Sequence, residues 1–438
     1  MTSFDGIARL LGRLGRGASL AARTALPVDT NPVPADWTHV TKVDPEDDKK
    51  LPLLYPLYLR HTSAVSVGGS ADVTATNTEE TFELLAPASV PVFHEPSGPR
   101  HVTPRTRARA DLLAIPEVLN GDSESLVGQL GEATEYVREE MVPETLREKL
   151  PWLPAFAEDA LADFATSWLL ADAVFEAYVI QNPDSAAARE ANVAESDLLA
   201  PREAKQRAMA AERHLESELL YLEYSGTFGG DEAVETLDAI SDGLTWSRLW
   251  YGGGIDSRDR ARAILDAGAD TVVVGDAFHR VADEERELCQ RAADALDPDA
   301  SAAAVREWVG ENVAVADSNA AAYLATIPGA PDPERLARRY LTATVRAWLC
   351  LRARREASGD ERGSASGRSL RADLRRALGA DLFDALAETD AALVRRNFAA
   401  LLGTDEPADS DHITRRTDGS RPSADEAVAT HLALALPP

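Results

Sequence analysis

The stretch "RLWYGGGIDSRDRARAILDAGADTVVVGD", residues 248–276, contains two short apolar runs that each end in glycine. Three consecutive glycines, Gly252, Gly253 and Gly254, follow the first run, and Gly275 and Asp276 close the second. The residues between the two runs predict a helix that begins near residue 257. Strand, glycine turn, helix and strand in this order predict a parallel unit whose turns can hold a phosphate group, because glycine lets backbone N–H groups approach an oxyanion closely.

The same alternation of strands and helices extends from Trp37 to about Asp283. Several of the apolar runs are almost continuous, as expected of parallel strands that are covered on both faces. Eight such runs predict an α/β fold, a closed (β/α)8 TIM-type barrel, with its chemistry at the C-terminal ends of the strands. The predicted strands are residues 38–44, 62–69, 90–96, 111–119, 177–182, 219–225, 248–254 and 271–276.

Two regions interrupt or follow the barrel, whose predicted limits are 37–291. The apolar, aromatic-bearing helical stretch 151–178 lengthens the connection between the fourth and fifth strands, which predicts a helical insertion over about 140–176. This insertion is either an extra packing layer or one wall of a hydrophobic groove. Residues 292–438 predict an additional all-α C-terminal domain with a mobile polar tail. Its arginine-rich part, 334–376, either pairs with the protein's own acidic surface or binds an anionic partner.

Residues 1–36 form an N-terminal extension that contains an amphipathic helical pattern. Its apolar face carries Ile7, Leu10, Leu11 and Leu14, and arginines occupy the other faces. Such a helix either docks on the rest of the protein or lies on an anionic membrane surface.

The composition is strongly acidic, with 73 Asp+Glu against 45 Lys+Arg and a formal net charge of -28. This balance argues against nucleic acid as a partner, which requires a cationic surface. It favours a salt-rich cytoplasm, because a strongly acidic surface keeps a protein soluble where salt screens charges over short distances. Two cysteines give no disulfide framework and are typical of a reducing, cytoplasmic location. No apolar run approaches the ~18 residues that a membrane span needs.

Candidate catalytic residues lie at the ends of the sixth and first predicted strands. Alternation places Tyr221, Glu223 and Ser225 on one face, towards the barrel mouth, where a carboxylate beside a bound phosphate can take the proton of a substrate alcohol. The alternative for Glu223 is an internal salt bridge. On the first strand, Lys42 suits a phosphate oxygen and Asp44 suits Mg²⁺.

A sparse metal site is predicted at the same rim. The second strand ends in "VGGS", which brings Ser70 close to Asp44. Mg²⁺ usually takes one or two protein oxygens and completes its shell with water and substrate phosphates. Asp44 with Ser70 therefore predicts an Mg²⁺ site for a diphosphate substrate.

In their order along the chain, these motifs resemble those of the geranylgeranylglyceryl phosphate synthase family. The resemblance covers roughly Trp37 to Asp283 and rests on "HVTKVDP", "VGGS", "EPSG", "QNPDS", "YLEYSGT", "YGGGIDS" and "VVVGD". It implies a (β/α)8 barrel that joins a prenyl diphosphate to sn-glycerol 1-phosphate with Mg²⁺, making the first ether bond of archaeal lipids. It implies a cytoplasmic enzyme with two small-molecule substrates, and leaves contact with a membrane surface and homo-oligomer formation open.

The resemblance also assigns roles to residues. Glu223, Lys42 and Tyr221 are the implied catalytic residues, with Glu223 as the base or orienting acceptor for the alcohol. Asp44 and Ser70 are the implied metal ligands. The implied phosphate- and glycerol-binding residues are Lys42, Tyr221, Leu222, Glu223, Tyr224, Ser225, Gly226, Gly252, Gly253, Gly254, Gly275 and Asp276.

Some positions depart from the family pattern. Asp72 replaces a usual glycine, and Asp276 replaces a usual asparagine, which puts a carboxylate beside the expected phosphate. Two unit charges ~4 Å apart repel by about 1 kcal/mol in water and about 4 kcal/mol at an effective dielectric constant of 20. Gly98, Glu117 and Gly121 also differ from the usual residues. Three alternatives therefore stay open: another prenyl length, another phosphorylated acceptor, or a catalytically silent scaffold or regulatory protein.

Overall fold

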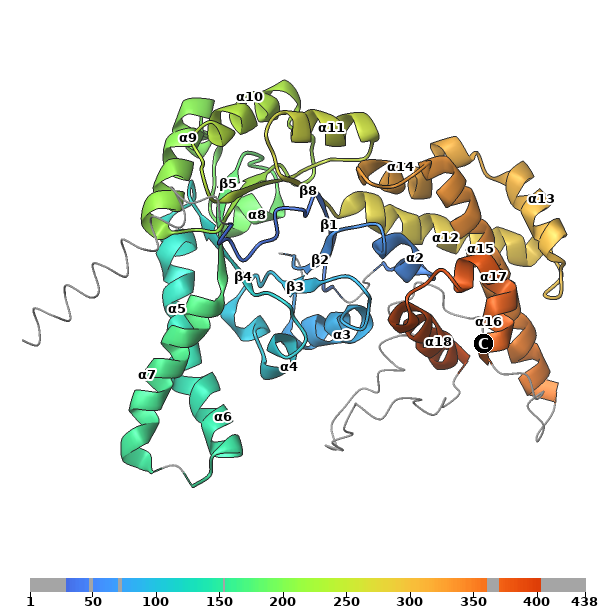
Figure 1. Cartoon of the computed structure of the whole chain (residues 1–438), viewed down its shortest axis with the longest axis horizontal. Coiled ribbons are helices and arrows are strands. Elements are labelled where there is room, and N and C mark those ends of the chain that lie inside the picture. The colour runs from blue at the N-terminus through green and yellow to red at the C-terminus, as the bar shows by residue number, and fades with distance from the viewer. Residues whose placement is uncertain (1–28, 47–49, 70–72, 153, 361–369, 403–438) are drawn as a thin grey trace, which may run out of the picture.

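The computed structural model describes residues 29–46, 50–69, 73–152, 154–360 and 370–402, and its centre is a barrel of eight parallel strands (Figure 1). The order is β3-β2-β1-β8-β7-β6-β5-β4, and a parallel bridge between His94 and Leu113 joins the two end strands. The predicted TIM-type barrel is thus confirmed. The strands are β1 His39–Val43, β2 Ala64–Val67, β3 Val92–His94, β4 Ala114–Val118, β5 Val174–Ile180, β6 Leu219–Glu223, β7 Arg248–Gly252 and β8 Thr271–Val274.

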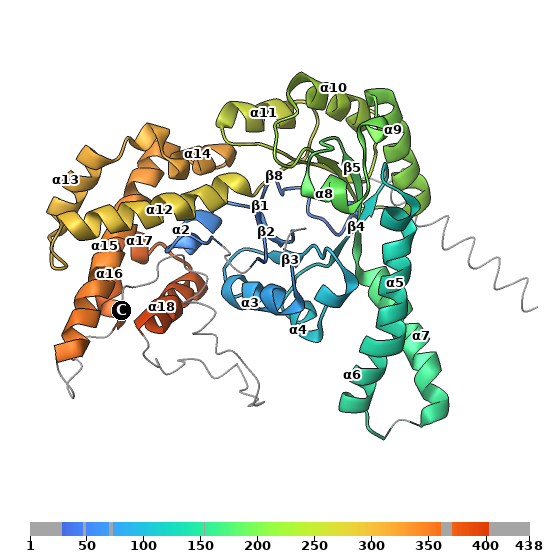
Figure 2. The same cartoon turned by 180° about the vertical axis from the view of Figure 1, so that it is seen from behind.

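Helices follow the strands and surround the barrel (Figures 1 and 2). The α-helices up to the end of the barrel are α2 Tyr55–Leu59, α3 Ala75–Leu85, α4 Pro104–Arg107, α5 Gln129–Tyr136, α6 Val142–Lys149, α7 Ala155–Asp172, α8 Ala186–Glu190, α9 Pro201–Ala210, α10 Gly230–Ser241, α11 Arg258–Asp266 and α12 Asp276–Ala295. They are followed by α13 Ala302–Asn312, α14 Asn319–Thr326, α15 Pro333–Asp360, α16 Leu370–Leu378, α17 Ala380–Phe383 and α18 Glu388–Leu402. Short 3₁₀-helices are Pro99–His101, Glu195–Asp197 and Val315–Asp317, and π-helical segments are Glu124–Gly128, Val137–Met141 and Ala211–Leu215.

Helices α6 and α7 lie within the predicted insertion, about 140–176. The helical region begins earlier than predicted, with α5, and the three helices project from the barrel as an arm (Figures 1 and 2). Its buried side chains, Val137, Val142 and Ala162, make a small cluster of their own. The arm therefore packs on itself, whereas an extra packing layer would share the barrel core. The prediction of helix through residue 178 is wrong, because β5 begins at Val174 and pairs with both β4 and β6.

The helices that follow α12 pack against the outside of the barrel. The hydroxyl of Tyr323 on α14 lies 2.7 Å from Thr41 Oγ1 on the outer face of β1. One continuous apolar cluster contains core residues of both the barrel and the C-terminal helices. Because α2 is only five residues long, α14 supplies part of the outer layer over β1.

A buried carboxylate links this outer layer to the loop after β1. Glu285 on α12 accepts hydrogen bonds from the Leu53 backbone N–H at 2.8 Å and from the hydroxyls of Tyr58 at 3.0 Å and Thr344 at 2.9 Å. Helices α2, α12 and α15 are joined through this one side chain.

Arginines of the basic C-terminal stretch pair with the protein's own acids. Arg354 Nε donates to Asp373 at 2.9 Å, and Arg375 Nε donates to Asp384 at 2.8 Å. The predicted N-terminal helix and the polar tail lie outside the described residues. None of the described helices combines the length and the apolar character needed to cross a bilayer.

Replacing Tyr323 with Phe is expected to lower the free energy of unfolding by about 1–3 kcal/mol, because the fully buried Thr41 hydroxyl loses its partner. Urea unfolding followed by circular dichroism measures this change. Trp168→Phe, at a side chain that is 58% exposed, is the aromatic control and should leave the midpoint unchanged. Equal midpoints for wild type and Tyr323→Phe would contradict the role given to α14.

Candidate active site

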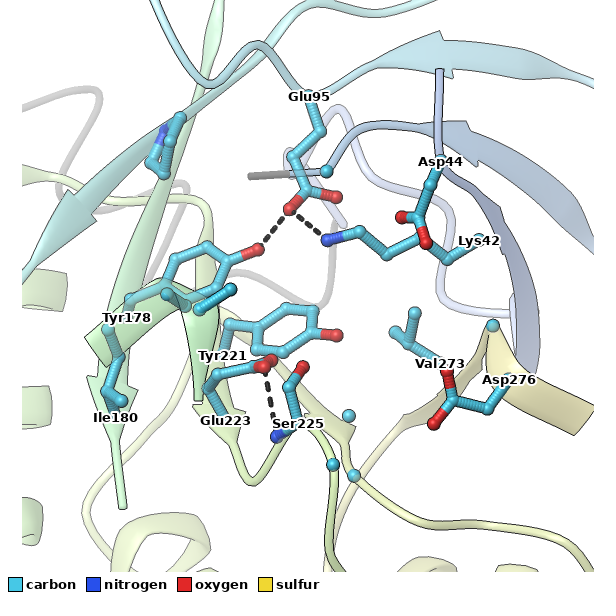
Figure 3. A pocket seen from close by; sticks show the side chains of 18 of the residues that line it. Lys42, Asp44, Glu95, Tyr178, Ile180, Tyr221, Glu223, Ser225, Val273 and Asp276 are labelled. Atoms are coloured by element: carbon cyan, nitrogen blue, oxygen red, sulfur yellow. Dashed lines mark hydrogen bonds and ion pairs between the residues drawn. The ribbon is translucent and has the colours of Figure 1, made fainter. Parts of the chain in front are cut away.

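A cavity of about 640 Å³ opens at the C-terminal ends of the strands (Figure 3). Most of the residues predicted from the sequence line it. They are Lys42, Asp44, Tyr221, Glu223, Ser225, Gly226, Gly252, Gly253, Gly254, Gly275 and Asp276. The two glycine turns and Glu223 therefore share one cavity.

Three predicted residues are placed differently. Leu222 is fully buried in the outer core, as its alternation with Tyr221 and Glu223 requires. Tyr224 stacks on Tyr251, with the ring centroids 5.8 Å apart, and its hydroxyl donates to Glu232. Ser70 lies outside the described residues, as does Asp72.

Glu223 is the last residue of β6 and is almost completely buried. Its Oε1 accepts a hydrogen bond from the Ser225 backbone N–H at 3.1 Å, so a backbone donor, not a cationic side chain, is its hydrogen-bond partner. Burial raises the pKa of the Glu223 carboxyl, and the positive charge of Lys42 partly opposes that rise. Glu223 is therefore a stronger base than an exposed carboxylate.

Glu95, which follows β3, is a central residue of the cavity that the sequence did not reveal. Its Oε1 accepts from Lys42 Nζ at 2.8 Å and from the Tyr178 hydroxyl (Figure 3). Its Oε2 accepts from Ser66 Oγ at 2.7 Å. Although burial raises the pKa of Glu95, Lys42 and the hydrogen bonds outweigh it and lower that pKa. The sequence signal that could have found Glu95 is its position directly after a short apolar strand. A carboxylate buried at such a strand end needs a hydrogen-bond or ionic partner.

Two tyrosines form an aromatic pair between Glu95 and Glu223. The rings of Tyr178 on β5 and Tyr221 on β6 stack with centroids 4.5 Å apart and an interplanar angle of 9°. Tyr221 is buried, and the burial and the charge of Glu223 raise the pKa of its hydroxyl. The pair connects the Lys42 side of the cavity to the Glu223 side.

The glycine turn after β7 packs so closely against its neighbours that a larger residue would not fit there. A Cβ on Gly252 would lie 2.0 Å from the Tyr221 hydroxyl oxygen. Gly254 has φ +52°, and a Cβ there would lie 2.6 Å from the Phe228 backbone N. Arg260 on α11, which the sequence analysis did not single out, donates to the Gly254 carbonyl oxygen at 3.0 Å.

The charge balance of the cavity is unfavourable for an anionic ligand. Asp276, at the start of α12, has an exposed carboxylate that points towards the cavity (Figure 3). Among the described residues, three cationic ones line the cavity, Lys42, Arg260 and Arg280; Lys42 pairs with Glu95 and Arg260 pairs with Asp256. The acidic residues of the described lining are Asp44, Glu46, Glu95, Glu190, Glu223, Asp256 and Asp276. A phosphorylated ligand therefore needs additional positive charge.

Asp44 provides the side-chain oxygens at the metal position predicted from the sequence. Its carboxylate is partly exposed, with Oδ2 3.7 Å from His279 Nδ1. A Cβ on Gly69 would lie 2.9 Å from Asp44 Oδ1, so the second strand leaves room for this carboxylate. The described part of the chain contains no cluster of three or more His, Cys, Asp or Glu residues suited to a metal. Among the described residues, this sparse set of side-chain oxygens is of the kind that Mg²⁺ uses, since Mg²⁺ usually takes one or two protein oxygens.

Comparison with known proteins gives one family. The model of the PcrB family matches residues 34–293. Geranylgeranylglyceryl phosphate synthase of Halobacterium salinarum is 34% identical over 248 residues, which are 56% of this chain and 89% of that protein. Heptaprenylglyceryl phosphate synthase of Bacillus cereus is 29% identical over 247 residues, 56% of this chain and 90% of that protein.

A solved structure is also similar. The crystal structure of (S)-3-O-geranylgeranylglyceryl phosphate synthase from Thermoplasma acidophilum, in complex with its substrate sn-glycerol-1-phosphate, matches with a TM-score of 0.41 and 20% identity. The match covers 56% of this chain and 86% of that chain.

Gly252→Ala is expected to destabilise the protein by about 1–3 kcal/mol, because the new methyl group would overlap the packed Tyr221 ring. Gly131→Ala is the matched control: Gly131 lies within α5 with nothing near the added Cβ, so alanine should stabilise by about 0.5–1 kcal/mol. Denaturant unfolding compares the two variants. A Gly252→Ala protein as stable as the wild type would show that Tyr221 is free to move.

Proposed function

The chain belongs to the PcrB family, and from this premise we propose that it transfers a prenyl group from a prenyl diphosphate to sn-glycerol 1-phosphate. The products are a prenylglyceryl phosphate ether and diphosphate. One observation carries the proposal: the buried Glu223 carboxylate shares a single cavity with both glycine turns and with Lys42 and Asp44. An alcohol held at the turns can thus meet a carbon activated near Lys42.

The residues divide the work between the two substrates. Ser225, Gly226 and the turns at 252–254 and 275–276 hold the phosphate of the acceptor, with backbone N–H groups as donors. Glu223 accepts the proton of the attacking hydroxyl, since its burial raises its basicity. The new bond joins the alcohol oxygen to the first prenyl carbon, and the bond from that carbon to diphosphate breaks. Lys42 lies near the departing phosphates.

Mg²⁺ is part of the proposal because the cavity has too little positive charge for its substrates. Asp44, with Ser70, would hold the ion, which would neutralise charge on the leaving diphosphate. The excess of acidic residues over cationic ones around the cavity supports this requirement.

We propose a geranylgeranyl donor and the first ether bond of an archaeal-type lipid, in keeping with the Halobacterium salinarum relative. The heptaprenyl name of the Bacillus cereus relative makes the longer chain the competing donor. A cytoplasmic location, with peripheral contact at a membrane surface, belongs to the same proposal because the donor carries a long apolar chain. A silent scaffold is the alternative that Asp276 favours, and the intact set of Lys42, Asp44 and Glu223 opposes it.

Purified protein incubated in high salt with glycerol 1-phosphate, Mg²⁺ and labelled geranylgeranyl diphosphate should form a labelled ether. Glu223→Gln should lower the rate by about 100-fold or more, since general-base catalysis contributes about 10²–10⁴-fold. Asp44→Asn should also lower the rate, because it weakens the hold on Mg²⁺. Glu235→Gln, an exposed acid outside the cavity, should keep the wild-type rate. Chelation of Mg²⁺ should remove activity, and added Mg²⁺ should restore it. No product with geranylgeranyl or heptaprenyl diphosphate would favour the scaffold.

Asp276→Asn is expected to lower the KM for glycerol 1-phosphate about 5-fold or more, because it removes a like charge whose repulsion is worth about 1–4 kcal/mol. The KM for the prenyl diphosphate should change little. Asp231→Asn, an exposed acid on α10, is the control for net charge. An unchanged KM for the acceptor would place the Asp276 carboxylate away from the phosphate.

A further inference from the structure

We infer that Glu95 is a positioning residue, which holds Lys42 and Tyr178 in the geometry that the transfer reaction needs. The inference rests on the proposed function of the same cavity. It starts from the three side chains that donate to one carboxylate: Lys42 from β1, Ser66 from β2 and Tyr178 from β5. Glu95 itself follows β3, so one side chain connects four strands across the barrel interior.

A buried ion pair is costly, and its presence here indicates a function. Taking two charges out of water costs several kcal/mol per ion, and an apolar pair of similar size is often as stable or more so. Lys42 is 22% exposed in its side chain and Glu95 only 8%, so the pair is largely desolvated. Both carboxylate oxygens of Glu95 accept hydrogen bonds, which lowers the cost of burying its charge.

The pairing is selective. Glu176 on β5 is also buried in the barrel interior, and neither of its carboxylate oxygens has a hydrogen-bond partner among the described residues. Burial and the nearby charge of Glu95 raise the pKa of Glu176 well above its usual value, which favours its neutral form. Of these two acids, only Glu95 accepts a hydrogen bond from Lys42, and this bond directs the Lys42 ammonium group towards Glu95.

Glu95 reaches the base through the tyrosines. Its bond to the Tyr178 hydroxyl fixes the ring that stacks on Tyr221, and Tyr221 lies beside Glu223 (Figure 3). The Glu95 carboxylate thus positions Lys42, on the proposed diphosphate side of the cavity. Through Tyr178 it also positions the aromatic pair, which lies on the proposed acceptor side. A displacement of about 1 Å in such a group costs on the order of 100-fold in rate.

Charge and position predict opposite results for Glu95→Gln. If Glu95 acted only through its charge, its removal from an acid-rich cavity would strengthen anion binding and raise kcat/KM. A glutamine places an NH2 group at one of the two oxygen positions, so Lys42 loses its ionic partner. The donors that face that NH2 group, either Ser66 or the pair of Lys42 and Tyr178, also lose their acceptor. We expect kcat/KM to fall about 10- to 100-fold, mainly in kcat. Glu95→Asp, which keeps both acceptor oxygens, should recover part of the loss.

The decisive experiment is a double-mutant cycle with Glu95→Gln, Lys42→Met and the double variant, assayed with geranylgeranyl diphosphate and glycerol 1-phosphate. Because Glu95 acts through Lys42 as well as through Tyr178, the loss of rate in the double variant should be smaller than the product of the two single losses. The inference would be overturned by a double variant whose loss of rate equals the product of the two single losses. It would also be overturned by a Glu95→Gln enzyme that is faster than the wild type. Glu117→Gln, a buried acid of β4 outside the cavity lining, is the matched control and should match the wild type in rate and unfolding midpoint.

The same cycle read by calorimetric binding of inorganic diphosphate with Mg²⁺ needs no turnover. Weaker binding by Glu95→Gln, with no further loss in the double variant, supports the inference even if no prenyl product forms. Stronger binding by Glu95→Gln overturns it. Absence of product in the wild type bears on the proposed function alone, so the two failures are distinguishable. Unfolding midpoints of all variants separate misplacement from loss of the fold.

Discussion

Closure of the barrel is the constraint on which the site depends. The bridge between His94 and Leu113 brings the short strand β3 to β4, and only a closed cylinder lets a residue after β3 reach side chains of β1 and β5. Because successive side chains of a strand alternate in direction, Lys42 and Tyr221 then face the same interior. The chemistry-bearing groups meet because the strands are parallel and their C-terminal ends share one rim.

That interior contains more acid than base, and the structure handles each acid differently. Glu95 is ionised and paired with Lys42, while burial without a partner favours the neutral form of Glu176. Glu223 has a backbone N–H as donor and a raised pKa, which leaves it available as a base. Acidic residues around an anionic substrate are thus compatible with binding when some are neutral or paired and a divalent cation supplies the remaining charge.

The sequence predicts the strands well because each apolar run is short and ends in glycine or polar residues. It predicts that Lys42, Glu223 and the glycine turns face one cavity, because alternation and strand ends are local properties. It misses Glu95, since the three-residue strand before it carries little periodicity and the partners Ser66 and Tyr178 are far away in sequence. It extends the helical insertion into β5 because an apolar run there has no local signal that separates helix from strand.

The helices beyond the matched family region contact β1, the strand that carries Lys42. The PcrB family match ends at residue 293, whereas α14 contacts the outer face of β1 through Tyr323 and through Thr326, whose Oγ1 lies 3.0 Å from His39 Nε2. His39 and Thr41 alternate with Lys42, so the outer contacts fix the backbone from which Lys42 and Asp44 project inward. A protein whose α2 is too short to cover β1 therefore obtains from its C-terminal helices the packing that steadies the strand from which Lys42 and Asp44 project.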